Sequence, residues 1–273
     1  MSVFTVPGKV FLIGEYSVLQ GGSALLAALR PGYVFDSLLG ADFIHPESPL
    51  GRYSREREKP ISLSRIKPSM PLGFGSSTAE LIAGVYSDLD RVPETTRLWA
   101  WYKDCFPILS GADLVVQLEA LKRKQNLFEF DQGKATRILA GNLCASIQVI
   151  QNCGEKLKTH EALKEKVPEL NIEKLTELKE RVRVALLENN LPALAALSEF
   201  ADVLNYYGLE TKLAHEIRMA LSRLPGVVGV KGCGAGLQDV FLVAGNPIDL
   251  KNLDELCLEL GLHRLGSLLD LLW

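Results

Sequence analysis

Hydrophobic residues near the start of the chain follow, in part, the two-residue period of a β-strand. They are interrupted at Pro7-Gly8 and then form a continuous run over Val10–Ile13. This pattern predicts two short strands or one bent strand, with Lys9 at the bend. Other short apolar runs predict strands at 34–39, 227–230 and 240–243.

Helical periodicity dominates two other regions. In the centre it predicts one helix from about 77 to 89 and another over 94–105. After Asn171, apolar residues three and four positions apart predict three amphipathic helices, the last ending at Pro225-Gly226. The leucine-rich segment 250–273 predicts a final helix that packs on a sheet.

The remaining segments complete the predicted fold. Residues 46–68 are rich in arginine and glutamate, and we expect a solvated loop or an edge hairpin there, unless its arginines reach an anionic ligand. Residues 138–152 suggest a strand leading into a helix. Strands alternate irregularly with helices, and helices gather in the second half, which predicts an α+β fold of two lobes. We place the domains at 1–140 and 141–273.

Composition limits the possible functions. A formal charge of −3 argues against a general nucleic-acid binder, although it allows a local basic pocket. The five cysteines are scattered and lack metal-ligand spacing, which favours reduced thiols in the cytoplasm. Neither a signal peptide nor a membrane-spanning run is visible, so we expect no membrane partner.

A glycine-rich stretch, Pro71–Glu80, leads directly into the central helical pattern. Gly73 and Gly75 let the backbone approach a ligand closely, and Ser76 or Ser77 can cap the helix. The first-turn N–H groups and the helix dipole favour an anion such as a polyphosphate. An ordinary loop with a serine cap accounts for the stretch equally well, and the Gly-Lys-Ser/Thr ending of a Walker loop is missing.

Two further stretches give the central loop a context. Pro7–Tyr16, which ends in Gly-Glu-Tyr, stands near the start, and Lys231–Asp239, which contains Gly-Cys-Gly-Ala-Gly, stands near the end. In this order, the three stretches resemble the three motifs of the GHMP kinase superfamily (galactokinase, homoserine, mevalonate and phosphomevalonate kinases). The resemblance covers nearly the whole chain, and within the superfamily it is greatest to phosphomevalonate kinases, followed by mevalonate kinases.

The resemblance implies a fold, cofactors and a site. The N-terminal lobe would be of the ribosomal-protein S5 type and the C-terminal lobe ferredoxin-like, with the active site in the cleft between them. ATP and Mg²⁺ would be bound, and a hydroxyl or phosphate oxygen of mevalonate or its 5-phosphate would be phosphorylated. Oligomeric state is left open between monomer and homodimer.

The same resemblance assigns roles to individual residues. Lys9 would lie beside the transferred phosphate, and Asp113, in a Ser-Gly-Ala-Asp sequence, would be the base or would orient the acceptor. Without the motif, Lys9 would be an ordinary edge-strand lysine and Asp113 a turn or cap residue. The ATP-binding residues would be Gly73, Gly75, Ser76, Ser77, Thr78, Gly234, Ala235 and Gly236, with the Ser77 hydroxyl on Mg²⁺.

The chain also departs from the family pattern. The interval between the first two motifs is short, so the base of the nucleotide must be held by an abbreviated loop or held weakly. Tyr102 stands where mevalonate kinases have a Mg²⁺-binding glutamate, with Asp104 nearby. Leu237-Gln238 replaces common glycines of the third motif and would stiffen that loop. A catalytically weak GHMP-fold ligand-binding or regulatory protein, and a diphosphomevalonate decarboxylase-like enzyme, are therefore the alternatives to a kinase.

Overall fold

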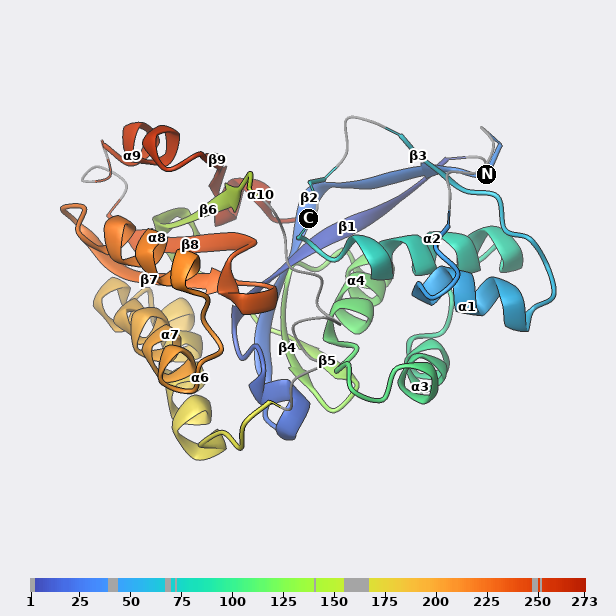
Figure 1. The fold of residues 1–273 in the computed structure, drawn as a ribbon, viewed down its shortest axis with the longest axis horizontal. Helices are drawn as coiled ribbons and strands as arrows, with labels where there is room; N and C mark the ends of the chain where they lie inside the picture. Colours follow the sequence, from blue (N-terminus) through green and yellow to red (C-terminus); the bar gives the residue numbers. More distant parts are fainter. Residues whose placement is uncertain are drawn as a thin grey trace. The chain divides into compact units, whose positions relative to one another are not determined.

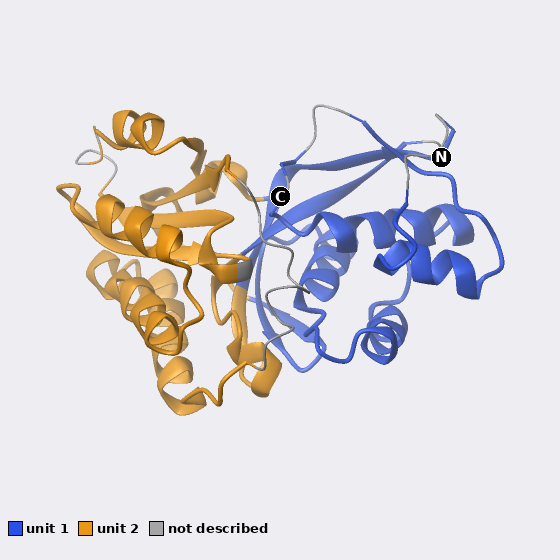
Figure 2. Ribbon diagram, in the orientation of Figure 1, with its two compact units in different colours: residues 1–10, 26–137, 273 blue, residues 11–25, 138–272 orange. Residues whose placement is uncertain are grey.

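The chain forms two compact units (Figure 2). Unit 1 comprises residues 1–10, 26–137 and 273, and unit 2 comprises 11–25 and 138–272. The predicted division at 140 differs from this arrangement, because residues 11–25 group with the second unit rather than the first. The computed structural model describes residues 3–38, 44–66, 70–71, 73–139, 141–154, 167–246, 250 and 252–273.

The described residues of unit 1 form a β-sheet and four helices. Strands follow the order β1-β2-β4-β5, and the short β3 pairs antiparallel with β2. Helices α1 to α4 lie together on one side of β1 and β2 (Figure 1). The strands are β1 (Val3–Ile13), β2 (Ala24–Asp36), β3 (Ser64–Ile66), β4 (Leu127–Asp131) and β5 (Lys134–Arg137), and the helices are α1 (Pro49–Glu56), α2 (Ser76–Leu89), α3 (Thr95–Cys105) and α4 (Ala112–Arg123).

The structure corrects the expectation for residues 46–68. Instead of a loop or hairpin, the segment contains helix α1 and strand β3. The Ser48 hydroxyl accepts a hydrogen bond from the N–H of Gly51, and Pro49 occupies the first turn, where its missing N–H costs nothing. Leu50 is 1 % exposed because it packs against Gly84 in the middle of α2. The cap and the buried Leu50 thus help to order a mainly polar segment as a helix.

Unit 2 is built on a four-stranded sheet of order β7-β8-β6-β9, in which every neighbouring pair is antiparallel. Helices α7 and α8 pack against β7, and α6 packs on α7. The strands are β6 (Ile147–Asn152), β7 (Val227–Cys233), β8 (Val240–Gly245) and β9 (Leu262–Ser267), and the helices are α6 (Ile172–Glu188), α7 (Ala196–Tyr206), α8 (Lys212–Ser222), α9 (Leu253–Glu259) and α10 (Leu268–Leu271). Short 3₁₀ turns are η1 (Ser17–Gln20), η2 (Asn142–Ser146), η3 (Leu191–Ala195) and η4 (Ala235–Leu237).

Two predictions fail in unit 2. The leucine-rich end of the chain is a helix, a strand and a helix, because Gly261 and Gly266 have φ angles of 68° and 138° that a helix does not tolerate. Strand β9, which starts after Gly261 and contains Gly266, pairs with β6. Residues 142–152 run in the opposite order to the one expected, with the helical turn η2 before β6. In both segments, the strand conformation depends on pairing with a strand that is distant in sequence.

Candidate active site

The glycine-rich loop ends where α2 begins, as predicted, but the cap differs from the expected one. Gly75 is the N-cap residue, and no side chain caps the helix, so the expected capping by Ser76 or Ser77 is wrong. Gly75 has φ 84°, which favours glycine. A side chain there would also meet Gln117 and the stem of Lys9 at 3.1 Å. The loop therefore needs glycine for both its conformation and its packing.

The first turn of α2 presents donors without intrahelical partners. The N–H of Ala79 is the first to bond back into the helix, to the carbonyl of Gly75. The N–H groups of Ser76, Ser77 and Thr78 precede it and add to the positive end of the helix dipole. Ser77 is exposed, and among the described residues its hydroxyl makes no hydrogen bond. This turn can receive an anion through backbone N–H groups and one available hydroxyl.

The Thr78 hydroxyl serves the protein interior instead. Thr78 is 3 % exposed, and its Oγ1 lies 3.0 Å from the carbonyl oxygen of Gly75 and 2.6 Å from Oε1 of Gln117. Only its backbone N–H is left for a ligand. Thr78 thus differs from Ser77, although both belong to the predicted ATP-binding set.

Lys9 and Asp113, the two predicted catalytic residues, form an ion pair in unit 1. Lys9 Nζ lies 3.0 Å from Oδ1 of Asp113. The lysine side chain is only 8 % exposed, whereas the aspartate side chain is 30 % exposed. The pair is therefore covered on the lysine side and open to solvent on the aspartate side.

Both partners are held by backbone features. The N–H of Lys9 donates to the carbonyl of Phe74, 2.9 Å away, which ties strand β1 to the glycine-rich loop. Asp113 lies in the first turn of α4, after the N-cap Gly111, where a carboxylate is favoured by the helix dipole. Trp99 packs against Gly111, and its indole N–H donates to the carbonyl of Ser110. The ion pair thus joins β1 and α4 beside the start of α2.

Gln117 is a site residue that the sequence reasoning missed. It is fully buried, one turn after Asp113 on α4. Its Oε1 accepts from the Thr78 hydroxyl, while its Nε2 donates to the carbonyls of Pro7 and Gly75 at 2.8 and 3.1 Å. One amide therefore links β1, the glycine-rich loop and α4. The sequence did offer one signal: Gln117 is a polar residue four positions after Asp113, and residues at this spacing lie on the same face of a helix.

The residues considered for a second metal ligand give no such site. Tyr102 is 4 % exposed on α3, and burial, with a smaller effect from the charge of Asp113, raises the pKa of its phenol. Asp104 lies on the same helix and is exposed. No cluster of three His, Cys, Asp or Glu side chains suited to a metal occurs in the described part of the chain. The exposed Ser77 hydroxyl and the half-buried Asp113 carboxylate nevertheless suit Mg²⁺, which takes most of its ligands from phosphates and water.

The third motif forms the turn between β7 and β8 in unit 2. Gly234 and Gly236 have φ angles of 88° and 61°, and Ala235 lies between them in η4. A side chain at Gly234 would collide with the carboxylate of Asp239. Leu237 is fully buried at φ 59°, and Asn152 donates to the carbonyl of Gln238. The two residues that replace glycines therefore anchor the loop to the interior.

A second lysine–carboxylate pair, which sequence reasoning also missed, lies beneath this loop. The Lys231 ammonium contacts Oε1 of Glu15, and it donates to the carbonyl of Gly232 at 2.8 Å. The side chains are 0 % and 6 % exposed. Burial alone would lower the pKa of Lys231, but Cys233 and Glu15 outweigh burial and raise it. The first motif therefore supplies a residue to each unit, Lys9 to unit 1 and Glu15 to unit 2.

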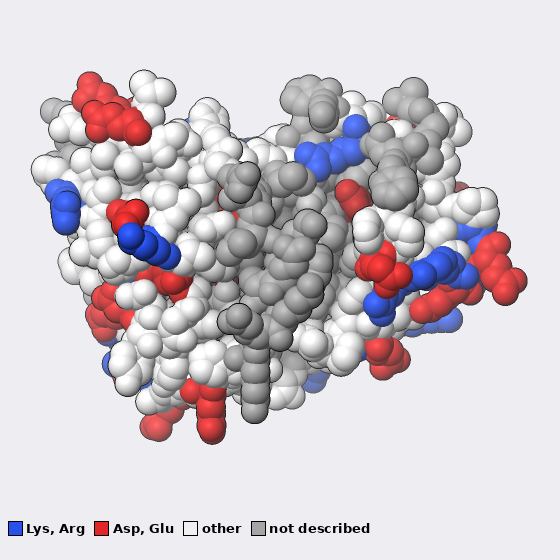
Figure 3. Space-filling view, viewed as in Figure 1, with Lys and Arg blue, Asp and Glu red and all other residues white. Residues whose placement is uncertain are grey.

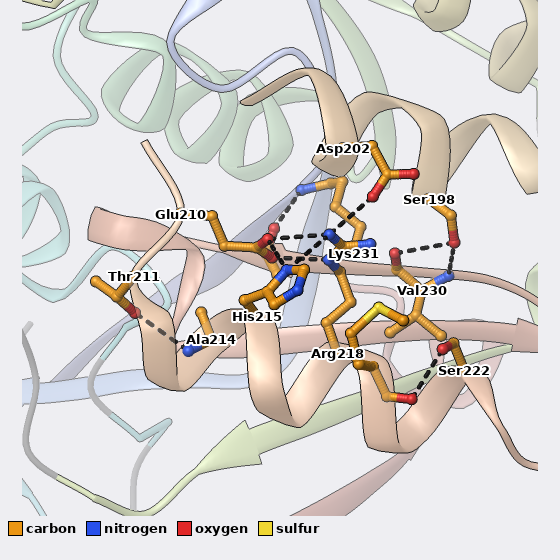
Figure 4. Close-up of polar contacts among 12 residues, drawn as sticks. Ser198, Asp202, Glu210, Thr211, Ala214, His215, Arg218, Ser222, Val230 and Lys231 are labelled. Atoms are coloured by element: carbon orange, nitrogen blue, oxygen red, sulfur yellow. Dashed lines mark hydrogen bonds and ion pairs between the residues drawn. The ribbon is translucent and has the colours of Figure 1, made fainter. Parts of the chain in front are cut away.

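A polar cluster around the buried side chains of Arg218 and Glu210 lies at α8, next to the segment that contacts this loop (Figure 4). Arg218 donates to both carboxylate oxygens of Glu210, at 2.7 and 3.0 Å, and also pairs with Asp202 of α7. Glu210 precedes Thr211, whose N–H donates to the carbonyl of Gly236 and whose hydroxyl donates to Gln238. The cluster therefore fixes the position of Thr211, which is hydrogen-bonded to the loop between β7 and β8.

Comparisons with known proteins identify the fold. No protein-family model matches the chain, and no curated protein resembles it in sequence. Solved structures do share its fold. Phosphomevalonate kinase of Streptococcus pneumoniae, in complex with phosphomevalonate and AMPPNP, has 16 % identity and a TM-score of 0.74, with 97 % of this chain and 98 % of that chain covered.

Two other GHMP kinases extend the likeness. Mevalonate kinase of Methanococcus jannaschii has 17 % identity and a TM-score of 0.65, with 97 % of this chain and 98 % of that chain covered. Galactokinase of Lactococcus lactis, complexed with galactose, has 13 % identity and a TM-score of 0.66, with 97 % and 94 % covered. This chain therefore has the GHMP kinase fold over nearly its whole length, which confirms the fold predicted from the three motifs.

No described helix is long and apolar enough to cross a membrane.

Proposed function

We propose that this chain is an ATP-dependent kinase that phosphorylates a small molecule, with phosphomevalonate or mevalonate as the acceptor. The Lys9–Asp113 pair carries the proposal, because its 3.0 Å contact joins the two motif residues whose charges phosphoryl transfer would use. The likeness to solved GHMP kinases supports the reaction class, and the Gly-Glu-Tyr sequence at 14–16 favours the phosphomevalonate acceptor.

In this proposal the first turn of α2 holds the phosphates of ATP. Phosphoryl transfer demands mainly positioning and charge balance, and unpartnered N–H groups at a helix start provide both. The Ser77 hydroxyl would hold Mg²⁺, which balances charge on the phosphate oxygens when bound. Gly234 and Ala235 would contribute backbone N–H groups to a phosphate, whereas the N–H of Gly236 already donates to the Tyr16 hydroxyl at 3.1 Å.

Lys9 and Asp113 have different roles in the proposed reaction. The Lys9 ammonium, on a flexible stem, balances negative charge on the transferred group. The Asp113 carboxylate takes a proton from an acceptor hydroxyl, or orients it, on the side of the pair that is open to solvent. An acceptor that is already a phosphate needs no strong base, and Asp113 then serves to orient it and to hold Lys9.

A coupled ADP-release assay tests the proposal. Mg²⁺-ATP is supplied with mevalonate, 5-phosphomevalonate, 5-diphosphomevalonate, homoserine or galactose, in parallel, with CO₂ detection to identify decarboxylation. We expect acceptor-dependent release with phosphomevalonate or mevalonate, at least about 100-fold slower in Lys9→Met. Lys134→Met, which changes an exposed lysine on β5, is the matched control and should keep full activity.

Three outcomes would contradict all or part of the proposal. CO₂ release from 5-diphosphomevalonate would identify the decarboxylase-like alternative. No release with any acceptor, together with no thermal shift from Mg²⁺-ATP, would favour a regulatory or ligand-binding protein. A thermal shift without turnover would support the nucleotide site and reject both named acceptors.

A further inference from the structure

Unit 1 contains a cavity that the proposed kinase reaction does not use. Its volume is about 560 Å³, and its walls come from α1, the end of α2, the turn that follows, α3, and Lys122 of α4. This volume is within the range of small-molecule sites. The cavity therefore has room for a ligand of one or two rings.

The cavity is separate from the glycine-rich loop. The lining residues of α2 are Val85 and Leu89, at the end of a 14-residue helix that starts at Ser76. At 1.5 Å per residue, the two ends of α2 lie about 20 Å apart. Among the described residues of the glycine-rich loop none lines the cavity, and neither Lys9 nor Asp113 does. A ligand here would not occupy the place proposed for the ATP phosphates.

One wall of the cavity is aromatic and held in place. The rings of Tyr53 and Trp101 meet edge to face, with centroids 5.5 Å apart and an interplanar angle of 88°. The indole N–H of Trp101 donates to Oε2 of Glu56 at 2.6 Å, and the Tyr53 hydroxyl donates to Asp88 at 3.1 Å. These bonds satisfy the polar atoms of both rings, so their apolar surfaces remain for a ligand to stack on.

The other distinguishing feature is an excess of positive charge. The described residues that line the cavity include four basic and two acidic ones, and Glu56 already accepts from Trp101. Lys122 donates to the Thr95 hydroxyl at 2.8 Å. Within the described part of the chain, by contrast, the guanidinium groups of Arg91 and Arg97 form neither a hydrogen bond nor an ion pair. Two uncommitted guanidinium groups are well suited to a phosphate or carboxylate.

Basic side chains elsewhere on this part of unit 1 are paired with carboxylates. Acidic and basic side chains intermingle over α1, where Glu47 pairs with both Arg52 and Arg55 (Figure 3). Asp88 likewise pairs with Arg57 and Lys59. The arginines of α1 are thus neutralised by neighbours, whereas Arg91 and Arg97 at the cavity are not.

We propose that this cavity, between α1, the C-terminal end of α2 and α3, is a second ligand site that binds a small organic anion. The ligand has a flat aromatic body, which stacks on Trp101, and a single phosphate or carboxylate, which pairs with Arg91 and Arg97. The site is independent of the proposed kinase reaction and does not require it.

Equilibrium dialysis of the full chain tests this site. The probes are 1-naphthyl phosphate, 1-naphthoate, neutral 1-naphthol and inorganic phosphate, at one fixed ionic strength. We expect one of the two naphthyl anions to bind at least tenfold more tightly than either 1-naphthol or inorganic phosphate, and the better anion tells a phosphate from a carboxylate ligand. The Arg91→Ala/Arg97→Ala variant should weaken anion binding at least tenfold, and it should still fold because both side chains are exposed.

Two further variants test whether binding occurs in this cavity. Arg137→Ala removes an exposed arginine of unit 1 that does not line the cavity, and it should leave binding unchanged. Trp101→Leu should weaken both naphthyl anions while leaving the weak binding of inorganic phosphate unchanged. The proposal is overturned if no naphthyl anion binds at millimolar concentration, if the double arginine variant binds within twofold of the parent, or if Arg137→Ala weakens binding as much as the double arginine variant does.

Discussion

The two units each contain a lysine–carboxylate pair, and the two pairs differ in their access to solvent. In unit 1, the Asp113 side chain is 30 % exposed beside a covered Lys9. In unit 2, Glu15 and Lys231 are 6 % and 0 % exposed, and Lys231 also donates to the Gly232 carbonyl. The same two charges thus form one pair that a ligand can reach and one that is sealed inside the protein.

This difference separates a reactive role from a structural one. A carboxylate that keeps part of its surface in water can exchange its partner for a substrate, since its desolvation cost is small. A sealed pair cannot, because removing either partner leaves a charge in the interior. We therefore expect changes at Glu15 and Lys231 to act on stability, and changes at Lys9 and Asp113 to act on turnover.

The largest effect on stability is expected from Glu15→Ala. The change leaves the buried Lys231 ammonium without its counter-charge and should lower the free energy of unfolding by about 3–5 kcal/mol. Urea denaturation followed by circular dichroism measures it. The paired variant Glu15→Leu/Lys231→Met, which removes both charges, should recover most of the loss. A loss below about 1 kcal/mol for Glu15→Ala would show that the buried pair is not structural.

Asp113→Asn should affect turnover more than stability. Turnover with the acceptor identified by the ADP-release assay should fall about 100-fold, which corresponds to about 2.7 kcal/mol in the activation barrier. The free energy of unfolding should fall by less than in Glu15→Ala, because water reaches the Asp113 position and the amide oxygen of the introduced side chain can still accept from Lys9. Steady-state kinetics and urea denaturation are measured on the same samples.

Asp131→Asn, at an exposed position at the end of β4, is the matched control for Asp113→Asn and should change neither quantity. Turnover of Asp113→Asn within a few-fold of the parent would reject a catalytic role for the Lys9–Asp113 pair.

A smaller effect is expected from Gln117→Leu. The substitution leaves the Thr78 hydroxyl and the carbonyls of Pro7 and Gly75 without the bonds that Gln117 provides, which should cost about 1–3 kcal/mol of stability. Gln117→Glu keeps the acceptor for Thr78 but places a buried carboxylate against the carbonyls of Pro7 and Gly75, so it should also lower stability, as measured by thermal unfolding. Equal stability of all three proteins would mean that Gln117 does not link β1, α2 and α4.

Sequence periodicity was a reliable guide where an element buries one regular face. Helix α3 was expected over 94–105 and is observed over Thr95–Cys105, and α6 begins directly after Asn171. It failed at α1, whose Ser48-Pro49 start was a readable capping signal, and at β9, whose strand conformation depends on pairing with β6. A capping signal is local and can be recognised in sequence, whereas a strand partner 110 or more residues away cannot.

The candidate site shows the same division. Lys9, Ser77 and Asp113 were selected because they occupy motif positions, and the structure brings Lys9 and Asp113 into contact. Gln117 was missed because no motif includes it. The Glu15–Lys231 pair was missed because its residues, which lie in the first and third motifs, are 216 positions apart and neither motif indicates that they meet. The cavity beside Trp101 was also missed, because its lining residues come from four separate helices and a turn.

By itself, the sequence determined the α+β class, the ordered set of three glycine-containing motifs and the residue types available for phosphate chemistry. These properties depend on local periodicity and on backbone freedom at glycine, both of which are written in neighbouring residues. Only the tertiary structure decided which lysine meets which carboxylate, and how deeply each pair is buried. Burial depends on all the elements that pack around a side chain, so it separates Lys9 from Lys231 although the two residues carry the same charge.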